Sequence, residues 1–567
     1  MAIILFRPSK KREWPFDIVV IFLIAAVIIS LYLWLSFDAY PIAGHDLLGI
    51  FPSVQLVRDI KGWGNDHLLY DMPVGRYYGS LLNYPPLSFI VLAYYYLIFG
   101  LQGQMAIMVN AFYICLILGT VYLIGKELFD AKTGLLAAFL LSCFPGFIAF
   151  SRSYWLEFGV IAYVCMVIYF LLKTDFFRNR FYSVMLGFSL ALAYLHKNEF
   201  IPFVAVPLAI AFFMPFLKDR EHARSLSRIM NASLAVIISF LCTHFWWSRY
   251  GVSSFGRMLS VFSSTAEIDI TGKATLLEKL LAPESLFFYF NSLLALLGGV
   301  FLVGFWIMFI FLSFRIVLKK EAMVPLLYLF SWFCIPFGVF TFTLLQVKYP
   351  THILALLPAI ALLISAGIYY VRPKVLQILI TVLVCAYGVN VFFSSLYAFG
   401  KSPLSFVRSL GGLNAETIIF RHMPEANNFD TFYPPRKEEL EKVIQEILQF
   451  INQDTGGGGR AQAVSVYQRP ALKNNAFYYY VLTQNYPLFF FASHFKMATS
   501  LEECDYLVIE QEGNVSLSEI LNREYGKVEL ERKHYREIFQ SGINDFRLIK
   551  EMDIPYGKER VLIYKRR

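Results

Sequence analysis

Eleven apolar runs of membrane length, separated by short polar connections, occupy most of the first 400 residues. A helix needs about 20 apolar residues to cross the hydrocarbon core of a bilayer. We therefore predict a transmembrane helix for each run. The runs cover residues 17–37, 105–125, 134–150, 155–172, 182–195, 200–217, 229–247, 286–314, 322–345, 351–371 and 375–397.

A shorter apolar segment, residues 86–99, follows Tyr84-Pro85 and ends at Gly100. With about 14 residues it is too short to cross a bilayer, so we predict a re-entrant or interfacial helix. If this segment crosses the membrane instead, every later segment reverses its direction.

The pattern changes beyond residue 400, where short mixed elements replace the long apolar runs. Residues 438–452 have apolar positions at helical spacing, which predicts an amphipathic helix. We predict strands at 463–467, 488–491, 506–510 and 560–564, and further helices at 475–483 and 516–525. Alternating strands and helices are typical of an α/β domain. The sequence therefore predicts an all-α polytopic membrane domain over residues 1–399, with about 11–13 transmembrane helices, and a small soluble α/β domain over residues 400–567.

The composition agrees with a membrane protein. Hydrophobic residues make up 57% of the chain and charged residues only 16%, whereas a soluble domain is about 25% charged. The net charge of +9 belongs to the membrane part, because residues 400–567 hold 22 basic and 22 acidic residues. The tail has no Gly-rich phosphate-binding loop. We expect the lipid bilayer, and not nucleic acid, as a partner.

The distribution of lysine and arginine predicts how the chain is oriented. With eleven spans and a cytoplasmic N-terminus, the inner segments hold 18 basic residues in 54 positions and the outer connections hold 10 in 121. Basic residues favour the cytoplasmic side of a membrane. We therefore predict a multi-pass protein of the cell membrane with a long first outer loop at 38–104 and an extracytoplasmic C-terminal domain.

Four outer connections carry ionisable side chains that return to this one face. They are His45-Asp46 in the first loop, Arg152 with Glu157 in the second connection, His196-Lys197-Asn198-Glu199 in the third, and Lys348-Tyr349 in another. A structural interpretation stays open for each: an acid can solvate a loop or begin a helix, and a lysine can snorkel to the interface. Charge at the edge of apolar segments is expensive and usually functional, which favours a shared site.

The order of these motifs resembles that of the C-type (GT-C) integral-membrane glycosyltransferases, in the branch of the protein O-mannosyltransferases and bacterial aminoarabinose transferases. The resemblance covers roughly residues 38–372. It rests on the acidic first outer loop, Tyr84-Pro85-Pro86-Leu87, the stretch from Gly125 to Ala138, Pro145-Gly146-Phe147, Glu157, Leu195-His196-Lys197, and Lys348-Tyr349-Pro350 with Pro358. Two positions depart from the family: His45-Asp46 stands where Asp-Glu is common, and Glu157 where Asp is common.

This resemblance implies a GT-C-like fold and a sugar donor linked through phosphate to a polyprenyl chain. The acceptor is then a hydroxyl of a lipid, a glycan or a protein. We predict that Asp46 is the base that takes the acceptor proton, with Glu157 in support, and that Lys197 and Lys348 hold the phosphate leaving group. One carboxylate acting on the acceptor face predicts inversion at the anomeric carbon. The remaining site candidates are His45, Tyr84, Arg152, His196, Glu199 and Tyr349; no cofactor is certain, and a divalent metal is left open.

A polytopic transporter or flippase of lipid-linked sugars is the alternative. Such a protein is expected to carry charges and broken helices near the bilayer midplane. This sequence keeps its ionisable residues at helix ends on one face, which favours chemistry at an interface.

Overall fold

The computed structural model divides the chain into two compact units. The first consists of Met1–Phe37, Arg76–Leu92 and Ile107–Pro424, and the second of Asp38–Gly75, Ala93–Ala106 and Glu425–Arg567. The structure describes residues 14–37, 46–61, 85–101, 103–218, 226–248, 283–318, 323–342, 350–394, 437–455, 461–466, 488–491, 505–512, 546–553 and 559–567.

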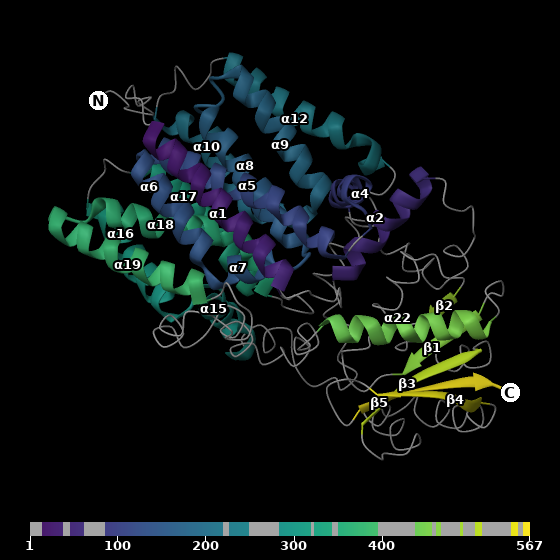
Figure 1. The fold of residues 1–567 in the computed structure, drawn as a ribbon. Coiled ribbons are helices and arrows are strands. Elements are labelled where there is room, and N and C mark those ends of the chain that lie inside the picture. Colours follow the sequence, from purple (N-terminus) through teal and green to yellow (C-terminus); the bar gives the residue numbers. More distant parts are fainter. Residues whose placement is uncertain are drawn as a thin grey trace. The chain divides into compact units, whose positions relative to one another are not determined.

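The described part of the first unit is helical throughout (Figure 1). Its helices, two of which begin or end in the second unit, are α1 (Trp14–Phe37), α4 (Leu87–Phe99), α5 (Gly103–Leu128), α6 (Ala131–Cys143), α7 (Pro145–Ser151), α8 (Leu156–Lys173), α9 (Arg180–His196), η2 (Asn198–Phe200), α10 (Ile201–Lys218), α12 (Leu226–Trp246), α15 (Pro283–Leu297), α16 (Gly299–Leu318), α17 (Met323–Phe342), η6 (Pro350–Leu356), α18 (Leu357–Tyr370) and α19 (Lys374–Ser394).

These helices confirm the predicted polytopic membrane domain. Among the described residues, nine helices are long and apolar enough to cross a membrane, or ten if α6 and α7 form one bent span. Every predicted apolar run overlaps one described helix or two consecutive ones; the run at 182–195 is α9, which has 17 residues. The short segment at 86–99 is the helix α4, whose 13 residues are too few to cross a bilayer; its re-entrant or interfacial placement stays a prediction.

Two runs predicted as single helices are broken, so that prediction was wrong for both. The run at 134–150 bends by 65° between α6 and α7, where Phe144 is extended because a proline follows it. The run at 286–314 is divided at Gly298, whose φ of +74° is left-handed and ends α15. An apolar run does not by itself reveal a change of helix axis.

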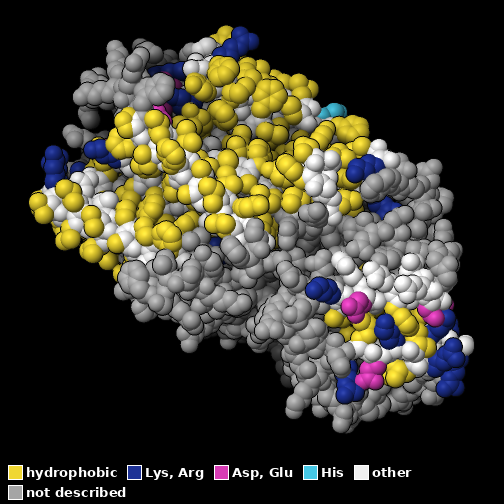
Figure 2. Space-filling model, viewed as in Figure 1, with side chains coloured by type: hydrophobic (Ala, Val, Ile, Leu, Met, Phe, Trp, Pro, Cys, Tyr) yellow, Lys and Arg dark blue, Asp and Glu magenta, His cyan; other side chains and the backbone are white. Residues whose placement is uncertain are grey.

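The surface of the first unit has the character expected of a membrane protein. Figure 2 shows hydrophobic side chains over most of its described surface in that view. On α16 and α19 many large apolar side chains are exposed, among them Ile307, Phe314, Leu379 and Val382. By contrast, α18 is buried along most of its length. We infer that α16 and α19 face lipid and that α18 forms part of the core.

The turn between α8 and α9 is left-handed over three successive residues that are not glycine. Asp175, Phe176 and Phe177 have φ values of +47°, +56° and +64°, a region that costs roughly 1–2 kcal/mol per L-residue. Two side chains of α12 bind the carbonyls of this turn. Arg228 Nε donates to the carbonyl oxygen of Phe176 at 2.7 Å, and Asn231 Nδ2 donates to that of Phe177 at 2.9 Å.

The second unit contains a five-stranded mixed sheet in the order β2-β1-β3-β5-β4. β1 is parallel to β2 and β3, and β5 is antiparallel to β3 and β4. The strands are β1 (Ala461–Val466), β2 (Leu488–Phe491), β3 (Tyr506–Glu512), β4 (Phe546–Asp553) and β5 (Glu559–Arg566). The four predicted strands correspond to β1, β2, β3 and β5, whereas β4 was not predicted. The helices predicted at 475–483 and 516–525 lie outside the described residues.

Two further helices of the second unit have amphipathic patterns. The predicted helix at 438–452 is α22 (Lys437–Asp454), which buries Val443, Ile444, Ile447, Leu448 and Ile451 on one face. Residues 46–61, treated from sequence as part of the first outer loop, form α2 (Asp46–Lys61) instead. Its buried Ile50, Val54 and Val57 recur at helical spacing.

A polar contact fastens the end of α22 to the sheet. The Asp454 carboxylate accepts hydrogen bonds from Lys565 Nζ at 2.8 Å and from the Tyr506 hydroxyl. These bonds lower the pKa of Asp454 from its ordinary value of 3.8; the lysine has the larger effect and the tyrosine follows. The contact therefore stabilises the folded unit more when Asp454 is ionised than when it is protonated.

Candidate active site

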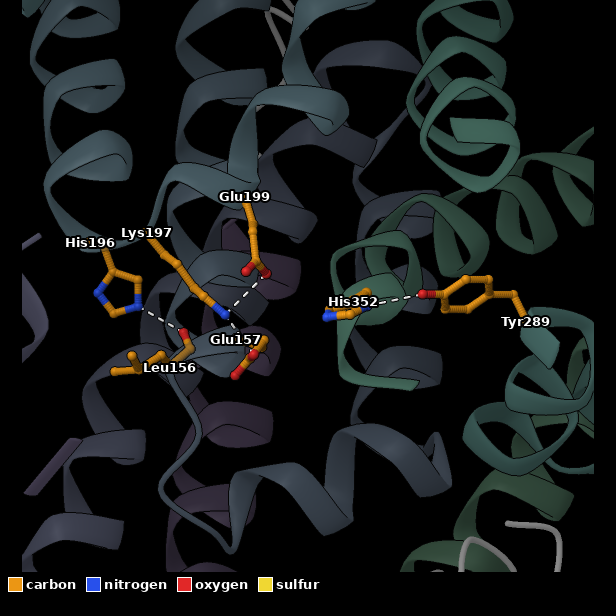
Figure 3. Close-up of polar contacts among 7 residues, drawn as sticks. All are labelled: Leu156, Glu157, His196, Lys197, Glu199, Tyr289 and His352. Carbon is orange, nitrogen blue, oxygen red and sulfur yellow. Dashed lines mark hydrogen bonds and ion pairs between the residues drawn. The ribbon is translucent and has the colours of Figure 1, made fainter. Parts of the chain in front are cut away.

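A buried ion pair joins the start of α8 to the end of α9. Lys197 Nζ lies 2.7 Å from Glu157 Oε1, and the two side chains are only 7% and 13% exposed. The same ammonium lies 3.0 Å from Glu199 Oε2, on a side chain that is 41% exposed. One lysine is thus shared by two carboxylates (Figure 3). We call Glu157, Lys197 and Glu199 the charged cluster.

The local fold explains why these three residues meet. Glu157 lies in the first turn of α8, where the helix dipole favours an acid. The chain reverses direction after α8, and α9 runs back along it. The end of α9 therefore lies beside the first helical turn of α8. At Lys197 the backbone becomes extended, with φ −164° and ψ 133°, and the chain then enters η2. This change of direction lets Lys197 reach both acids.

The electrostatics of the charged cluster follow from its burial. Two carboxylates and one ammonium carry a formal charge of −1. A buried charge without a partner is strongly destabilising, so Lys197 is what allows Glu157 to remain ionised. Glu199 is the more exposed acid. The cluster therefore offers an incoming ligand both a carboxylate and an ammonium in a site largely shielded from water.

His196 is adjacent to the cluster in sequence but points elsewhere (Figure 3). Its Nε2 lies 2.8 Å from the carbonyl oxygen of Leu156. The ring, 1% exposed, is in contact with the rings of Tyr113 and Tyr163. It also packs on Gly159, at which a Cβ would lie 2.3 Å from Nε2. His196 therefore joins the end of α9 to the first turn of α8 and so helps to position the adjacent Lys197.

The connection between α7 and α8 is held by a buried amide. Asn110 Nδ2 of α5 donates to the carbonyl oxygens of Ser151 at 2.9 Å and Ser153 at 2.7 Å. Arg152, between these two serines, is only 2% exposed. This connection leads directly into the first turn of α8 and thus helps to position Glu157.

A second polar pair, which was not among the predicted site residues, lies beside the cluster. His352 of η6 has its Nδ1 3.0 Å from the Tyr289 hydroxyl of α15. Its ring stacks on Phe340 of α17, with ring centroids 5.9 Å apart and planes at 19°. The charges of Glu199, Glu157 and Lys197 all act on His352. His352 comes shortly after Lys348-Tyr349-Pro350, so the sequence could have indicated it as a site residue. Tyr289 lies inside an apolar run, and nothing in the sequence marked it as part of a site.

The structure brings together Glu157, Lys197 and Glu199 of the predicted residues. Arg152 lies at the end of α7, in the connection that leads to α8, and His196 ends α9 next to Lys197. For Asp46 it describes only the backbone, as the first residue of α2. His45, Tyr84, Lys348 and Tyr349 lie outside the described residues, so their roles stay predictions. Within the ranges that the structure describes, no group of three or more His, Cys, Asp or Glu side chains is arranged to hold a metal ion.

Comparison with known proteins bears on the resemblance found in the sequence. Residues 83–247 match the model of the family described as dolichyl-phosphate-mannose-protein mannosyltransferase. A comparison with curated protein sequences found no match.

Solved structures match the chain over most of its length. ArnT from Cupriavidus metallidurans bound to undecaprenyl phosphate matches with a TM-score of 0.56 at 13% identity, covering 98% of each chain. The same protein in the apo state matches with a TM-score of 0.55 at 14% identity, over 96% of this chain and 97% of that one.

An archaeal protein matches over a smaller share of its own length. The oligosaccharyltransferase from Archaeoglobus fulgidus in the apo form matches with a TM-score of 0.51 at 13% identity, over 88% of this chain and 70% of its own. Together, the family model and these folds confirm the resemblance, and the chain has the fold of a GT-C integral-membrane glycosyltransferase.

Proposed function

We propose that this protein transfers a sugar from a polyprenyl-phosphate donor to an acceptor hydroxyl at the extracytoplasmic face of the membrane, with inversion at the anomeric carbon. The charged cluster is the observation that carries the proposal. It places a buried, ionised acid and a cation at adjacent helix ends, in a fold shared with ArnT, which was solved bound to undecaprenyl phosphate.

The reaction requires a base and a cation, and the chain offers candidates for both. The acceptor oxygen forms a bond to the anomeric carbon while its proton passes to a carboxylate. The bond from that carbon to the phosphate oxygen breaks, and polyprenyl phosphate leaves with the bonding electrons. We assign Asp46 as the base and Glu157 as the acid that orients the acceptor. Lys197 and Lys348 balance the phosphate charge.

The proposed face follows from the distribution of basic residues, and reporter fusions test it. A reporter inserted after Lys132 is expected on the cytoplasmic side, and one inserted after Gly400 on the opposite side. A reporter at Lys132 that is extracytoplasmic would show that residues 86–99 cross the membrane, and the proposed face would then be wrong.

Mass analysis of lipid-linked sugars and envelope glycans tests the function itself. In cells that lack the protein, one polyprenyl-phosphate sugar should accumulate and one glycan or lipid modification should disappear. A Glu157→Gln variant should behave like the deletion. Glu127→Gln serves as the control, because Glu127 forms a partly exposed pair with Lys173 at 3.1 Å elsewhere in the same helical unit. Unchanged lipid-linked sugars in deleted cells would contradict a transferase.

A further inference from the structure

The charged cluster holds one ammonium for two carboxylates. Lys197 is shared between Glu157 and Glu199, and the three residues together carry a formal charge of −1. A donor phosphate that Lys197 helps to balance therefore gains from a further hydrogen-bond donor. Among the described residues, His352 is a nitrogen-bearing side chain that faces the cluster from another element (Figure 3).

The orientation of His352 is fixed from two sides. Tyr289, which is fully buried, lies 3.0 Å from Nδ1, and Phe340 stacks on the ring face. Figure 3 shows Tyr289 on one side of the imidazole and the cluster on the other. With Nδ1 directed at Tyr289, Nε2 occupies the edge of the ring toward the cluster.

The charges around His352 also determine which nitrogen carries the proton. In the part of the chain that the structure describes, the titratable groups that face it are Glu157 of α8, Lys197 at the end of α9, Glu199 of η2 and Tyr289 of α15; α17 contributes the apolar Phe340. A lone pair on Nε2 would face two carboxylates, only one of which Lys197 neutralises. The favoured tautomer therefore has the proton on Nε2, with the Tyr289 hydroxyl donating to Nδ1.

From this geometry we propose that His352 binds the phosphate of the donor through its Nε2–H, with Tyr289 as the residue that positions it. This inference rests on the proposed function and assigns the phosphate contact of that same site. It gives the phosphate a donor on the side of the cluster opposite Lys197, so that the leaving group need not separate Lys197 from Glu157.

Two amide substitutions separate the two nitrogens of His352. Gln places its amide nitrogen near the position of Nε2, and Asn places its amide near that of Nδ1. We expect His352→Asn to weaken binding of undecaprenyl phosphate by about 10- to 100-fold, as for the loss of a hydrogen bond to a charged group. His352→Gln should weaken it only a few-fold. Tyr289→Phe, which keeps the ring packing, should fall between them.

Binding of undecaprenyl phosphate and of undecaprenol to the purified full chain in detergent tests the proposal. Undecaprenol has no phosphate, so its binding should be unchanged in all three variants. Equal binding of undecaprenyl phosphate by His352→Asn and wild type would overturn the assignment, and if transfer were also lost His352 would act on the acceptor instead. An equal loss of undecaprenol binding would also overturn it, because the residue would then only shape the site. A wild-type protein that binds neither lipid would instead refute the proposed function.

Discussion

The ammonium of Lys197 lies 2.7 Å from a carboxylate oxygen of Glu157, forty residues earlier in the chain, and both side chains are buried. Removing one partner of a buried pair leaves an uncompensated charge, which costs about 3–5 kcal/mol. We therefore expect Lys197→Gln to lower the thermal stability of the purified protein markedly. Combining it with Glu157→Gln should restore much of that stability.

A matched control lies in the same unit. Lys173 and Glu127 are 3.1 Å apart, and each side chain is 25% exposed. Because more exposed pairs contribute only about 0–1 kcal/mol, Lys173→Gln should have a small effect. Similar losses of thermal stability in Lys197→Gln and Lys173→Gln would show that burial does not set the strength of the Glu157 pair. The same would follow if the variant with both Lys197→Gln and Glu157→Gln recovered no stability.

The proposed base is tested by a change that keeps the size of the side chain. Asp46→Asn cannot accept a proton at neutral pH, so transfer should fall by roughly 10²- to 10⁴-fold while the donor still binds. Asp38→Asn removes an acid eight positions earlier in the sequence and should have far less effect. Near-normal transfer by Asp46→Asn together with an inactive Glu157→Gln would identify Glu157 as the base.

Gly159 is predicted to be essential for the contact of α8 with His196. A Cβ at this position would lie 2.3 Å from His196 Nε2 and 2.5 Å from Cε1, and the ring is held by Leu156 and two tyrosines. Gly159→Ala should therefore destabilise the protein by about 1–3 kcal/mol, as overpacking does. Gly119→Ala in α5 has nothing within 4 Å of the new methyl group and should leave the unfolding temperature almost unchanged. Equal unfolding temperatures for the two variants would contradict the contact.

The lowered pKa of Asp454 predicts a pH-dependent contribution to stability. A carboxyl whose pKa is lower in the folded state stabilises the fold above its unfolded pKa, and the effect is lost as the pH falls through the folded pKa. Wild type should thus unfold at a higher temperature than Asp454→Asn at neutral pH. This difference should shrink as the pH falls below the ordinary value of 3.8. A difference that is the same at pH 7 and pH 3 would show that the ionised carboxylate does not act through Lys565 and Tyr506.

Much of the first unit was predictable because membrane helices have long apolar sequences. The positions of Glu157, Lys197 and Glu199 were also predictable, since charged groups stood out in very short connections. Tyr289 was not, because a tyrosine within an apolar run has the same pattern whether it faces lipid or a site. The break at Gly298 had a usable signal in the Gly298-Gly299 pair. β4 was missed because Phe546–Asp553 alternates only weakly between polar and apolar residues.

The left-handed turn at Asp175–Phe177 makes the order of membrane insertion matter to the site. During synthesis α8 and α9 leave the ribosome before α12, so the hairpin is complete before Arg228 and Asn231 are available to bind the turn. Until they are, the turn is held by bonds of its own, such as those from Asn179 N to the carbonyl oxygen of Thr174 and from Phe177 N to Thr174 Oγ1. Arrival of α12 adds two side-chain hydrogen bonds to the turn and so stabilises the hairpin whose helices carry Glu157 and Lys197 at their other ends. A folding fault in α12 would thus weaken the hairpin that positions the charged cluster.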